Sequence, residues 1–130
     1  MLRRMLKSKI QQARVTDKEL FYAGSLAIAV EILEAAEIQC GEAVHVYNMN
    51  NGERFETYAI PAPRGSGIVS VKGAACRKVE EGDEILVISF ADYSEEELRE
   101  YSHRIVYVSD SNHLLRVEQR TQADYLEGES

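Results

Sequence analysis

The residues of this sequence best suited to covalent chemistry are a glycine and a serine in succession, Gly24 and Ser25. A serine hydroxyl can attack a carbonyl, and a glycine beside it permits backbone angles and a close approach that a side chain would hinder. Taken alone the pair is a weak signal, because Gly-Ser before a helical stretch usually marks a turn and a helix N-cap. The remaining sequence has to decide between a nucleophile and a cap.

Several short motifs accompany this pair, in order, over most of the chain. They are Arg3-x-Met5-Leu6-x-x-Lys9, Val15-Thr16, Tyr22-x-Gly24-Ser25, Asn51-Gly52-x-Arg54-x-x-Thr57-Tyr58, Arg64-Gly65-Ser66-Gly67, Gly73-Ala74-Ala75, Gly82-Asp83 and Ser89-Phe90-Ala91-Asp92-Tyr93. In these residues and their order the sequence resembles the pyruvoyl-dependent aspartate α-decarboxylases. Each motif is short, but together they are specific, so the resemblance favours the nucleophile.

The resemblance implies a fold, an assembly and a reaction. The family has a double-psi β-barrel, forms homotetramers with active sites between subunits, and decarboxylates L-aspartate to β-alanine and CO2 for pantothenate biosynthesis. Its cofactor is a pyruvoyl group made from the chain itself: the Ser25 hydroxyl would attack the Gly24 carbonyl, and the ester would eliminate to dehydroalanine, which hydrolyses. Decarboxylating an amino acid leaves a carbanion, and a ketone that condenses with the substrate nitrogen is a sufficient electron sink. Some relatives need an accessory maturation protein.

The resemblance also assigns roles to four polar residues. Thr57 would hold the Gly24 carbonyl oxygen during self-cleavage, as a donor aimed at the developing oxyanion, and would line the substrate site. Arg54, by itself a surface residue beside a turn, would clamp a substrate carboxylate, and Lys9 would add positive charge for a dianionic substrate. Tyr58 would donate a proton to the carbanion. Because strand side chains alternate, either the strand bends at Thr57 and Tyr58 or they serve opposite sides.

The segment around position 72 both supports and qualifies the resemblance. Gly73-Ala74-Ala75 consists of small residues that would line the pocket and let a substrate lie against backbone amides. Just before it is Lys72, where relatives usually have Asn; two further departures are Gln11, often His, and Ala29, commonly Asp. An ammonium in place of an amide changes the local charge and hydrogen bonding. Lys72 either extends into solvent, or points inward and attracts an acidic substrate or alters self-cleavage.

Two other functions stay open beside the decarboxylation of L-aspartate. Lys72 and Gln11 permit the same machinery to act on another acidic amino acid. Alternatively, the chain is an uncleaved paralogue that serves as a binding or regulatory barrel, with Ser25 as a helix cap. Product analysis tests the first alternative, and the mass of the denatured chain tests the second.

The elements that must position these residues are mostly strands. Runs rich in β-branched and aromatic residues, about ten residues apart, favour a closed small barrel over a parallel α/β sheet, so the fold class is mainly β with two or three short helices. Asn50-Asn51-Gly52 predicts a hairpin turn. Ser94 and Glu97 predict a capping box on a short exposed helix, and a second helix is predicted from Leu26 to Glu37. The predicted strands are 43–47, 55–60, 67–71, 84–90 and 104–108.

Length and composition limit the remaining possibilities. At 130 residues the chain fits a single domain, 1–130, with a polar, acidic tail from about residue 118 that we expect to be mobile. The net charge of -7 argues against nucleic-acid binding. No apolar run reaches signal-peptide or membrane-spanning length, so we expect a cytoplasmic protein without membrane contact. Small molecules or proteins are the expected partners.

The cysteines and histidines give no metal signature. Cys40 and Cys76 are too few and too far apart for a metal knuckle or a redox pair, and we expect buried free thiols. The histidines, His45, His103 and His113, show no metal-binding spacing. We therefore predict no metal.

Overall fold

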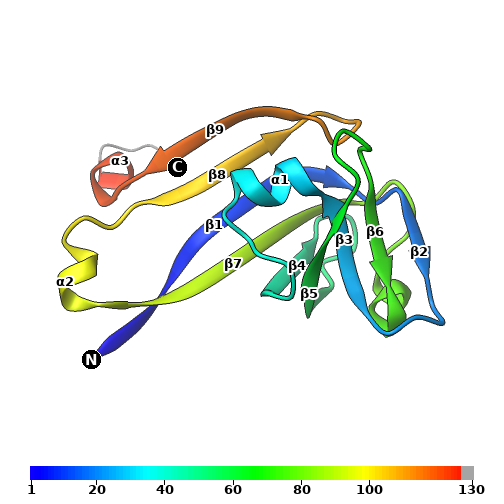
Figure 1. Ribbon diagram of the computed structural model, residues 1–130, viewed down its shortest axis with the longest axis horizontal. Coiled ribbons are helices and arrows are strands. Elements are labelled where there is room, and N and C mark those ends of the chain that lie inside the picture. The colour runs from blue at the N-terminus through cyan, green and yellow to red at the C-terminus, as the bar shows by residue number, and fades with distance from the viewer. Residues whose placement is uncertain (127–130) are drawn as a thin grey trace.

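Strands account for most of the fold in the computed structural model, which describes residues 1–126 (Figure 1). The strands are β1 (Leu2–Arg14), β2 (Asp17–Glu19), β3 (Ser25–Ala29), β4 (Ala43–Asn48), β5 (Arg54–Ala62), β6 (Val69–Lys72), β7 (Glu84–Ser94), β8 (His103–Val108) and β9 (Leu114–Arg120). The helical segments are α1 (Val30–Ala35), the 3-10 helix η1 (Gly73–Lys78), α2 (Glu95–Leu98) and α3 (Gln122–Leu126).

The strands form one mixed sheet in the order β2-β6-β3-β5-β4-β7-β1-β8-β9. Three neighbouring pairs are parallel, β1 with β8, β2 with β6 and β3 with β5, and the other pairs are antiparallel. β3 is therefore paired on both edges, with a parallel neighbour on one and an antiparallel neighbour on the other. The predicted mainly β class is confirmed, and the topology is consistent with a double-psi β-barrel.

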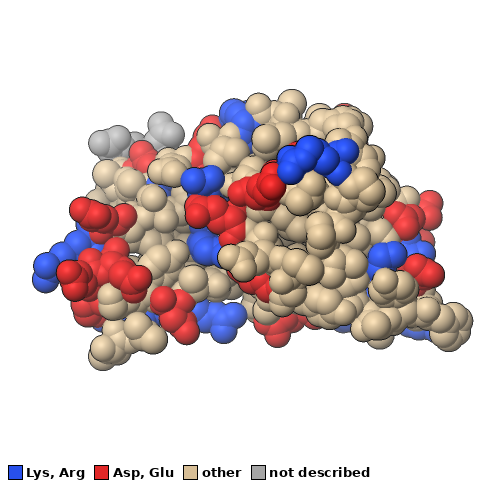
Figure 2. Space-filling view, viewed as in Figure 1, with Lys and Arg blue, Asp and Glu red and all other residues tan. Residues whose placement is uncertain are grey.

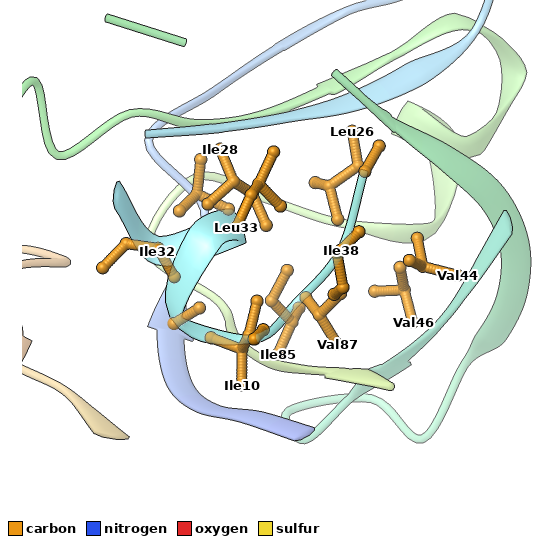
Figure 3. Close-up of a cluster of buried hydrophobic side chains, with 14 of the residues drawn as sticks. Ile10, Leu26, Ile28, Ile32, Leu33, Ile38, Val44, Val46, Ile85 and Val87 are labelled. Atoms are coloured by element: carbon orange, nitrogen blue, oxygen red, sulfur yellow. The ribbon is translucent and has the colours of Figure 1, made fainter. Parts of the chain in front are cut away.

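A cluster of apolar side chains fills the space between the strands (Figure 3). Ile10 of β1, Leu26 and Ile28 of β3 and Val87 of β7 are at most 1% exposed, and Ile32 adds a contribution from α1. Figure 3 shows these side chains pointing toward one another. Each aliphatic side chain of this size stabilises the fold by about 1.5–3 kcal/mol relative to an exposed one. Burial and pairing therefore both hold β3 in place.

The predicted helix Leu26–Glu37 is wrong at its beginning. Ser25–Ala29 form the strand β3, and only Val30–Ala35 form α1. Ala, Leu and Ile favour a helix by intrinsic propensity, but every residue of β3 is buried between two strands, and a short continuous apolar run also suits a fully buried strand. Ser25 consequently does not cap a helix, because the N-cap of α1 is Ala29, which makes no side-chain cap hydrogen bond.

The predicted hairpin and capping box are confirmed. β4 and β5 pair in antiparallel fashion across the loop that contains Asn50-Asn51-Gly52, where Gly52 has a φ of 76°. The Glu97 amide donates to the Ser94 hydroxyl, and the Ser94 amide donates to the Glu97 carboxylate, at the start of the exposed helix α2. All the predicted strands are present, with bounds that differ by a few residues.

β1 and β9 lack the apolar pattern that predicts strands. β1 is basic at its start, yet it is paired on both edges, with β7 and β8. β9 is largely exposed and pairs with β8, and α3 follows it. Main-chain hydrogen bonding therefore accounts for β9 more than side-chain burial does. The tail predicted from about residue 118 begins inside β9 and includes α3; its mobility stays a prediction, and residues 127–130 lie outside the described part.

The surface, the helices and the metal-binding residue types add four observations. On the face drawn in Figure 2, charged side chains gather at the end that carries α2, whereas the surface over β3, β4 and β5 shows few. Within residues 1–126, no helix is long and apolar enough to span a membrane, and no three His, Cys, Asp or Glu side chains group as a metal site.

Cys76 is buried, but Cys40 is exposed in the loop before β4, so the prediction of buried thiols is wrong for Cys40.

Candidate active site at Gly24 and Ser25

Ser25 begins β3 and lies between two strands that carry predicted site residues. In the antiparallel register with β6, Ser25 is opposite Lys72. In the parallel register with β5, Leu26 is opposite Ala59, which places Tyr58 alongside Ser25. The pairing therefore brings three motifs to one end of β3: Gly24-Ser25, Thr57-Tyr58 and Lys72-Gly73.

The Ser25 hydroxyl is buried and has no hydrogen-bond partner among the residues that the structure describes. The residue is only 1% exposed. Buried polar groups are nearly always paired, and one left unsatisfied costs about 1–3 kcal/mol. Such a cost is expected where a group is held for a reaction and does not serve the stability of the fold. The environment of Ser25 therefore fits a nucleophile.

Gly24 is selected by its backbone conformation. Its φ of 91° lies in a region that residues with side chains rarely adopt. A Cβ built on Gly24 would meet no described atom within 4 Å, its two chain neighbours apart. The surroundings would thus admit a side chain, and the positive φ is what requires glycine.

Gly73 is the glycine of this site that has no room for a side chain. It begins η1 with a φ of 81°, and a Cβ on it would lie 2.6 Å from the Gly24 Cα and 2.9 Å from the Gly24 nitrogen. Real Cβ atoms essentially never come so close to a backbone. Of the alanines that follow, Ala74 is exposed and Ala75 packs against the core. Beyond the predicted pocket-lining role, Gly73 supports the residues just before Ser25.

Thr57 and Tyr58 lie on opposite faces of β5. Burial alternates from Arg54 to Ala59, so that Phe55, Thr57 and Ala59 are the more buried residues and Arg54 and Tyr58 are exposed. The alternation is regular, which indicates that the strand does not bend here and that the two side chains serve opposite sides. Tyr58 is 38% exposed and shares its face with Arg54.

Lys72 does not extend freely into solvent, as one interpretation of the sequence had it. Its side chain is 18% exposed, and its ammonium nitrogen lies 3.3 Å from a Glu19 carboxylate oxygen and 4.6 Å from the centre of the Tyr22 ring. Glu19 ends β2, and Tyr22 belongs to the segment that leads to Gly24. The charge of Lys72 is therefore committed to residues that precede the Gly24-Ser25 bond.

Lys9 lies away from Ser25 within this chain. It belongs to β1, and three strands, β5, β4 and β7, separate β1 from β3 in the sheet order. There its charge helps to lower the pKa of the His103 imidazole, an effect that comes second to burial. Gln11, a departure from the family pattern, is on the same strand opposite Tyr107 and is likewise not at Ser25.

Arg54 is also apart from the start of β3. It precedes Tyr58 by four residues on an extended strand, so their Cα atoms are roughly 13 Å apart. Its guanidinium lies 4.4 Å from the centre of the Tyr47 ring. Ala29, the third departure from the family pattern, is buried at the end of β3 opposite to Ser25.

Comparison with known sequences identifies a family. A sequence model of the family described as aspartate decarboxylase matches residues 1–115, which include every residue of the candidate site. The chain belongs to the aspartate decarboxylase family.

Individual relatives in this family are similar over most of their length. The aspartate 1-decarboxylase of Methylobacillus flagellatus is 49% identical over 114 residues, 88% of this chain and 90% of that protein. The aspartate 1-decarboxylase of Herminiimonas arsenicoxydans is 46% identical over 113 residues, 87% of this chain and 95% of that protein. That of Chromobacterium violaceum is 47% identical over 121 residues, 93% and 96% of the two chains. The similarity therefore extends over most of the chain.

The aspartate decarboxylase family is pyruvoyl-dependent, and the Ser25 hydroxyl differs from those of the other buried serines among the described residues. Among the other buried serines, the hydroxyls of Ser8 and Ser89 bond each other at 2.6 Å, and Ser70 donates to Asp17 at 2.9 Å. Only Ser25, within the described residues, is a buried serine without a partner. The residues present therefore fit formation of the group at this position.

Glu19 is a residue of the site that the sequence pattern does not reveal. Tyr22 belongs to a family motif, but nothing local pairs Glu19 with Lys72, 53 residues further along the chain. The contact arises because β2 and β6 pair in parallel with Glu19 opposite Lys72. A register set by the whole barrel is needed to predict it.

Proposed function

We propose that this member of the aspartate decarboxylase family cleaves itself between Gly24 and Ser25 and then decarboxylates L-aspartate to β-alanine and CO2. The β-alanine would serve pantothenate biosynthesis in the cytoplasm. The observation that carries the proposal is the buried, unpartnered Ser25 hydroxyl at the start of a strand paired on both edges. Relatives named aspartate 1-decarboxylase, similar over most of the chain, support the choice of substrate.

Self-cleavage requires only Gly24, Ser25 and water as reactants. The Ser25 oxygen adds to the Gly24 carbonyl carbon, and the bond from that carbon to the Ser25 nitrogen breaks, which gives an ester and a free amino group. Loss of the Ser25 α proton and of the Gly24 carboxylate leaves dehydroalanine. Water then replaces the nitrogen, ammonia departs, and the pyruvoyl group remains as the new N-terminus. We assign Thr57 as the donor to the oxyanion formed in the first step.

The pyruvoyl group supplies the electron sink for the pair of electrons left when CO2 departs. The residues of the chain bind and orient the substrate around it. Gly73-Ala74-Ala75 would line the pocket at the start of η1, and Arg54 clamps a carboxylate while Lys9 balances the second negative charge. Tyr58, alongside Ser25, donates a proton to the carbon that has lost CO2.

We also propose a homotetramer in which each active site takes residues from two subunits. Lys9 and Arg54 lie away from Ser25 within one chain, although both would bind the same substrate. Aromatic side chains beside the cleavage bond are exposed, Phe21 by 93% and Tyr22 by 50%. Exposed aromatic residues are enriched at protein contacts. A neighbouring subunit that covers them would supply Lys9 and Arg54 to the site.

Mass spectrometry of the denatured protein tests self-cleavage. The purified 14.7 kDa chain should convert into fragments 1–24 and 25–130, and the larger should be lighter than simple hydrolysis predicts, by the mass of ammonia. Ser25→Ala should stay intact, and the control Ser66→Ala, in an exposed turn, should cleave normally. Cleavage only in the presence of cell extract indicates an accessory maturation protein. A wild-type chain that stays intact under both conditions overturns the proposal in favour of a binding or regulatory barrel.

Product analysis tests the choice of substrate independently. The cleaved protein should release CO2 from L-aspartate and form β-alanine, with slower turnover of L-glutamate and related acidic amino acids. Faster turnover of another acidic amino acid would overturn the assignment of aspartate and leave self-cleavage intact.

Mixed oligomers test whether two subunits share a site. Arg54→Ala removes the carboxylate clamp and Ser25→Ala removes the pyruvoyl group, so each variant alone should be inactive. When both are co-expressed, a Ser25→Ala subunit can supply Arg54 to a neighbour that carries the pyruvoyl group, and part of the activity should return. Light scattering gives the mass of the assembly. Mixed tetramers without activity would contradict the shared site.

A further inference from the structure

The segment from Leu20 to Gly24 has few main-chain contacts. It connects the end of β2 with the start of β3, and one main-chain hydrogen bond, from the Tyr22 amide to the Leu20 carbonyl, is described within it. Phe21 and Ala23 are exposed, and so is Tyr22 in part. Contacts other than sheet pairing must therefore fix the conformation of Gly24 next to Ser25.

Lys72 and Gly73 provide such contacts from the end of β6. The Lys72 ammonium is 3.3 Å from the Glu19 carboxylate and 4.6 Å from the centre of the Tyr22 ring. The bare backbone of Gly73 lies directly against Gly24, with the Tyr22 carbonyl oxygen 3.2 Å from where its Cβ would be. Lys72 is also opposite Ser25 in the sheet register. These two residues thus contact both sides of the bond that is to be cut.

We propose that Lys72 is a positioning residue for self-cleavage. It holds Glu19 and Tyr22 so that the Gly24 carbonyl stays beside the Ser25 hydroxyl, and it acts on cleavage and not on substrate binding. A lysine can contact a carboxylate and an aromatic face together, which a shorter, neutral Asn cannot do. The inference rests on the proposed self-cleavage and names a residue that controls its rate.

The contacts that the Lys72 ammonium already makes with Glu19 and Tyr22 argue against a role in binding the substrate. A substrate carboxylate that approached the Lys72 ammonium would meet the negative charge of Glu19, which lies 3.3 Å from that ammonium in the parallel register of β2 and β6. Removal of the Lys72 charge should leave the fold intact, because residues 1–24 are also held in the sheet by β1, which is paired on both edges. The consequence should therefore be confined to the segment before Ser25.

The rate of cleavage tests the proposal. Purified precursors are incubated at one temperature, and the large fragment is followed by mass spectrometry. Lys72→Met keeps the length of the side chain and removes the charge, and it should slow cleavage about fivefold to tenfold, the range expected for loss of one cation–π contact and one ion pair. Lys72→Arg should cleave at nearly the wild-type rate. The control Lys78→Met breaks a similar ion pair, 3.0 Å from Glu53 on the hairpin side, and should have no effect.

A charge exchange and steady-state kinetics separate positioning from other roles. Glu19→Lys and Lys72→Glu should each slow cleavage, and the double variant should regain part of the rate because the pair is restored with opposite polarity. Fully matured Lys72→Met should keep the wild-type KM for L-aspartate. If wild type cleaves and Lys72→Met cleaves equally fast, the inference is overturned and the proposed function stands. The same holds if Lys72→Met has a raised KM for L-aspartate and an unchanged cleavage rate. A wild-type chain that never cleaves overturns the proposed function itself.

Discussion

The two sides of the Gly24-Ser25 bond are held in opposite ways. On the C-terminal side, every residue of β3 is buried, and the strand is paired with β5 and β6. On the N-terminal side, Phe21 and Ala23 are exposed, and the segment depends on side-chain and backbone contacts with Lys72 and Gly73. A fixed strand and a loosely held segment therefore meet at one peptide bond.

This difference suits an intramolecular attack on the chain itself. The nucleophile gains from being fixed, because a reacting atom held in position avoids the entropy cost of finding its target. The acyl side must change geometry at the Gly24 carbonyl and then separate from Ser25. The contrast predicts that substitutions where the two sides meet will affect cleavage more strongly than equally disruptive substitutions elsewhere.

The largest effect is expected for Gly73→Ala. Its Cβ would lie 2.6 Å from the Gly24 Cα, so the backbone before Ser25 must shift. A displacement of about 1 Å at a reacting centre can cost about a hundredfold in rate, and cleavage followed by mass spectrometry should slow by at least about that factor. The matched control is Gly82→Ala, which has a similar φ of 91° and open surroundings. If both variants cleave equally fast, the contact of Gly73 with Gly24 is not what matters.

Thr57→Val tests the inward face of β5. The substitution keeps the shape of the side chain and removes the hydroxyl assigned to the oxyanion, so cleavage should slow about a hundredfold. Tyr58→Phe, on the opposite face of the same strand, should cleave normally and lose decarboxylation in the matured protein. Cleavage rates and turnover are measured on both variants. An effect of Tyr58→Phe on cleavage would contradict the separation of the two faces.

A smaller loss is expected for Gly24→Ala. No steric clash opposes it beyond the chain neighbours, and the penalty comes from a φ of 91°, which costs a residue with a side chain about 1–2 kcal/mol. That corresponds to cleavage about tenfold slower if attack requires this disfavoured φ to be adopted. Comparison with Gly73→Ala in the same assay shows which slows cleavage more, the unfavourable φ at position 24 or the steric clash at position 73. A complete block by Gly24→Ala would restore the interpretation that a side chain prevents the hydroxyl from approaching.

Local patterns in the sequence predict the features that depend on nearby residues. The Gly24-Ser25 pair, the hairpin at Asn50-Asn51-Gly52 and the capping box at Ser94 depend on residues close together in the chain. The start of β3 was the exception, because an Ala- and Leu-rich run buried on both faces resembles a helix until its strand neighbours are known.

Contacts between distant segments could not be predicted in this way. The pairing of Glu19 with Lys72 depends on the register of β2 and β6, and the separation of Lys9 from Ser25 depends on the strand order. β1 is polar enough at its start to resemble a loop, and it becomes a strand because β7 and β8 pair with both of its edges. The family motifs indicated the chemistry, and the strand order and register determine which groups meet.

The smallest effect on cleavage is expected at a cluster remote from the bond. His103 is buried on β8, with its Nε2 2.9 Å from the Tyr125 hydroxyl of α3 and its Nδ1 3.3 Å from the Tyr101 hydroxyl. Burial is the main cause that lowers the pKa of His103, and the charges of Lys9 and Arg120 lower it further, against an opposing effect of Asp124. Burial also raises the pKa of Tyr101 to about 12, so this phenol stays neutral in the same range of pH.

The sign of the resulting pH dependence follows from the lowered pKa. Above the ordinary value of 6.5, His103 is neutral in the folded and the unfolded chain and contributes no pH dependence. Below 6.5 the unfolded chain takes up a proton on this imidazole more readily than the folded chain does. The free energy of unfolding therefore decreases as the pH is lowered, until the folded pKa is reached. Melting temperatures at pH 7.5 and 5.5 should therefore fall less for His103→Gln than for wild type, whereas the exposed control His113→Gln should follow wild type. Cleavage rates of His103→Gln at pH 7.5 should match wild type, because this cluster touches neither side of the Gly24-Ser25 bond; a slower rate would show that the fixed strand and the loose segment are coupled to the far end of the sheet.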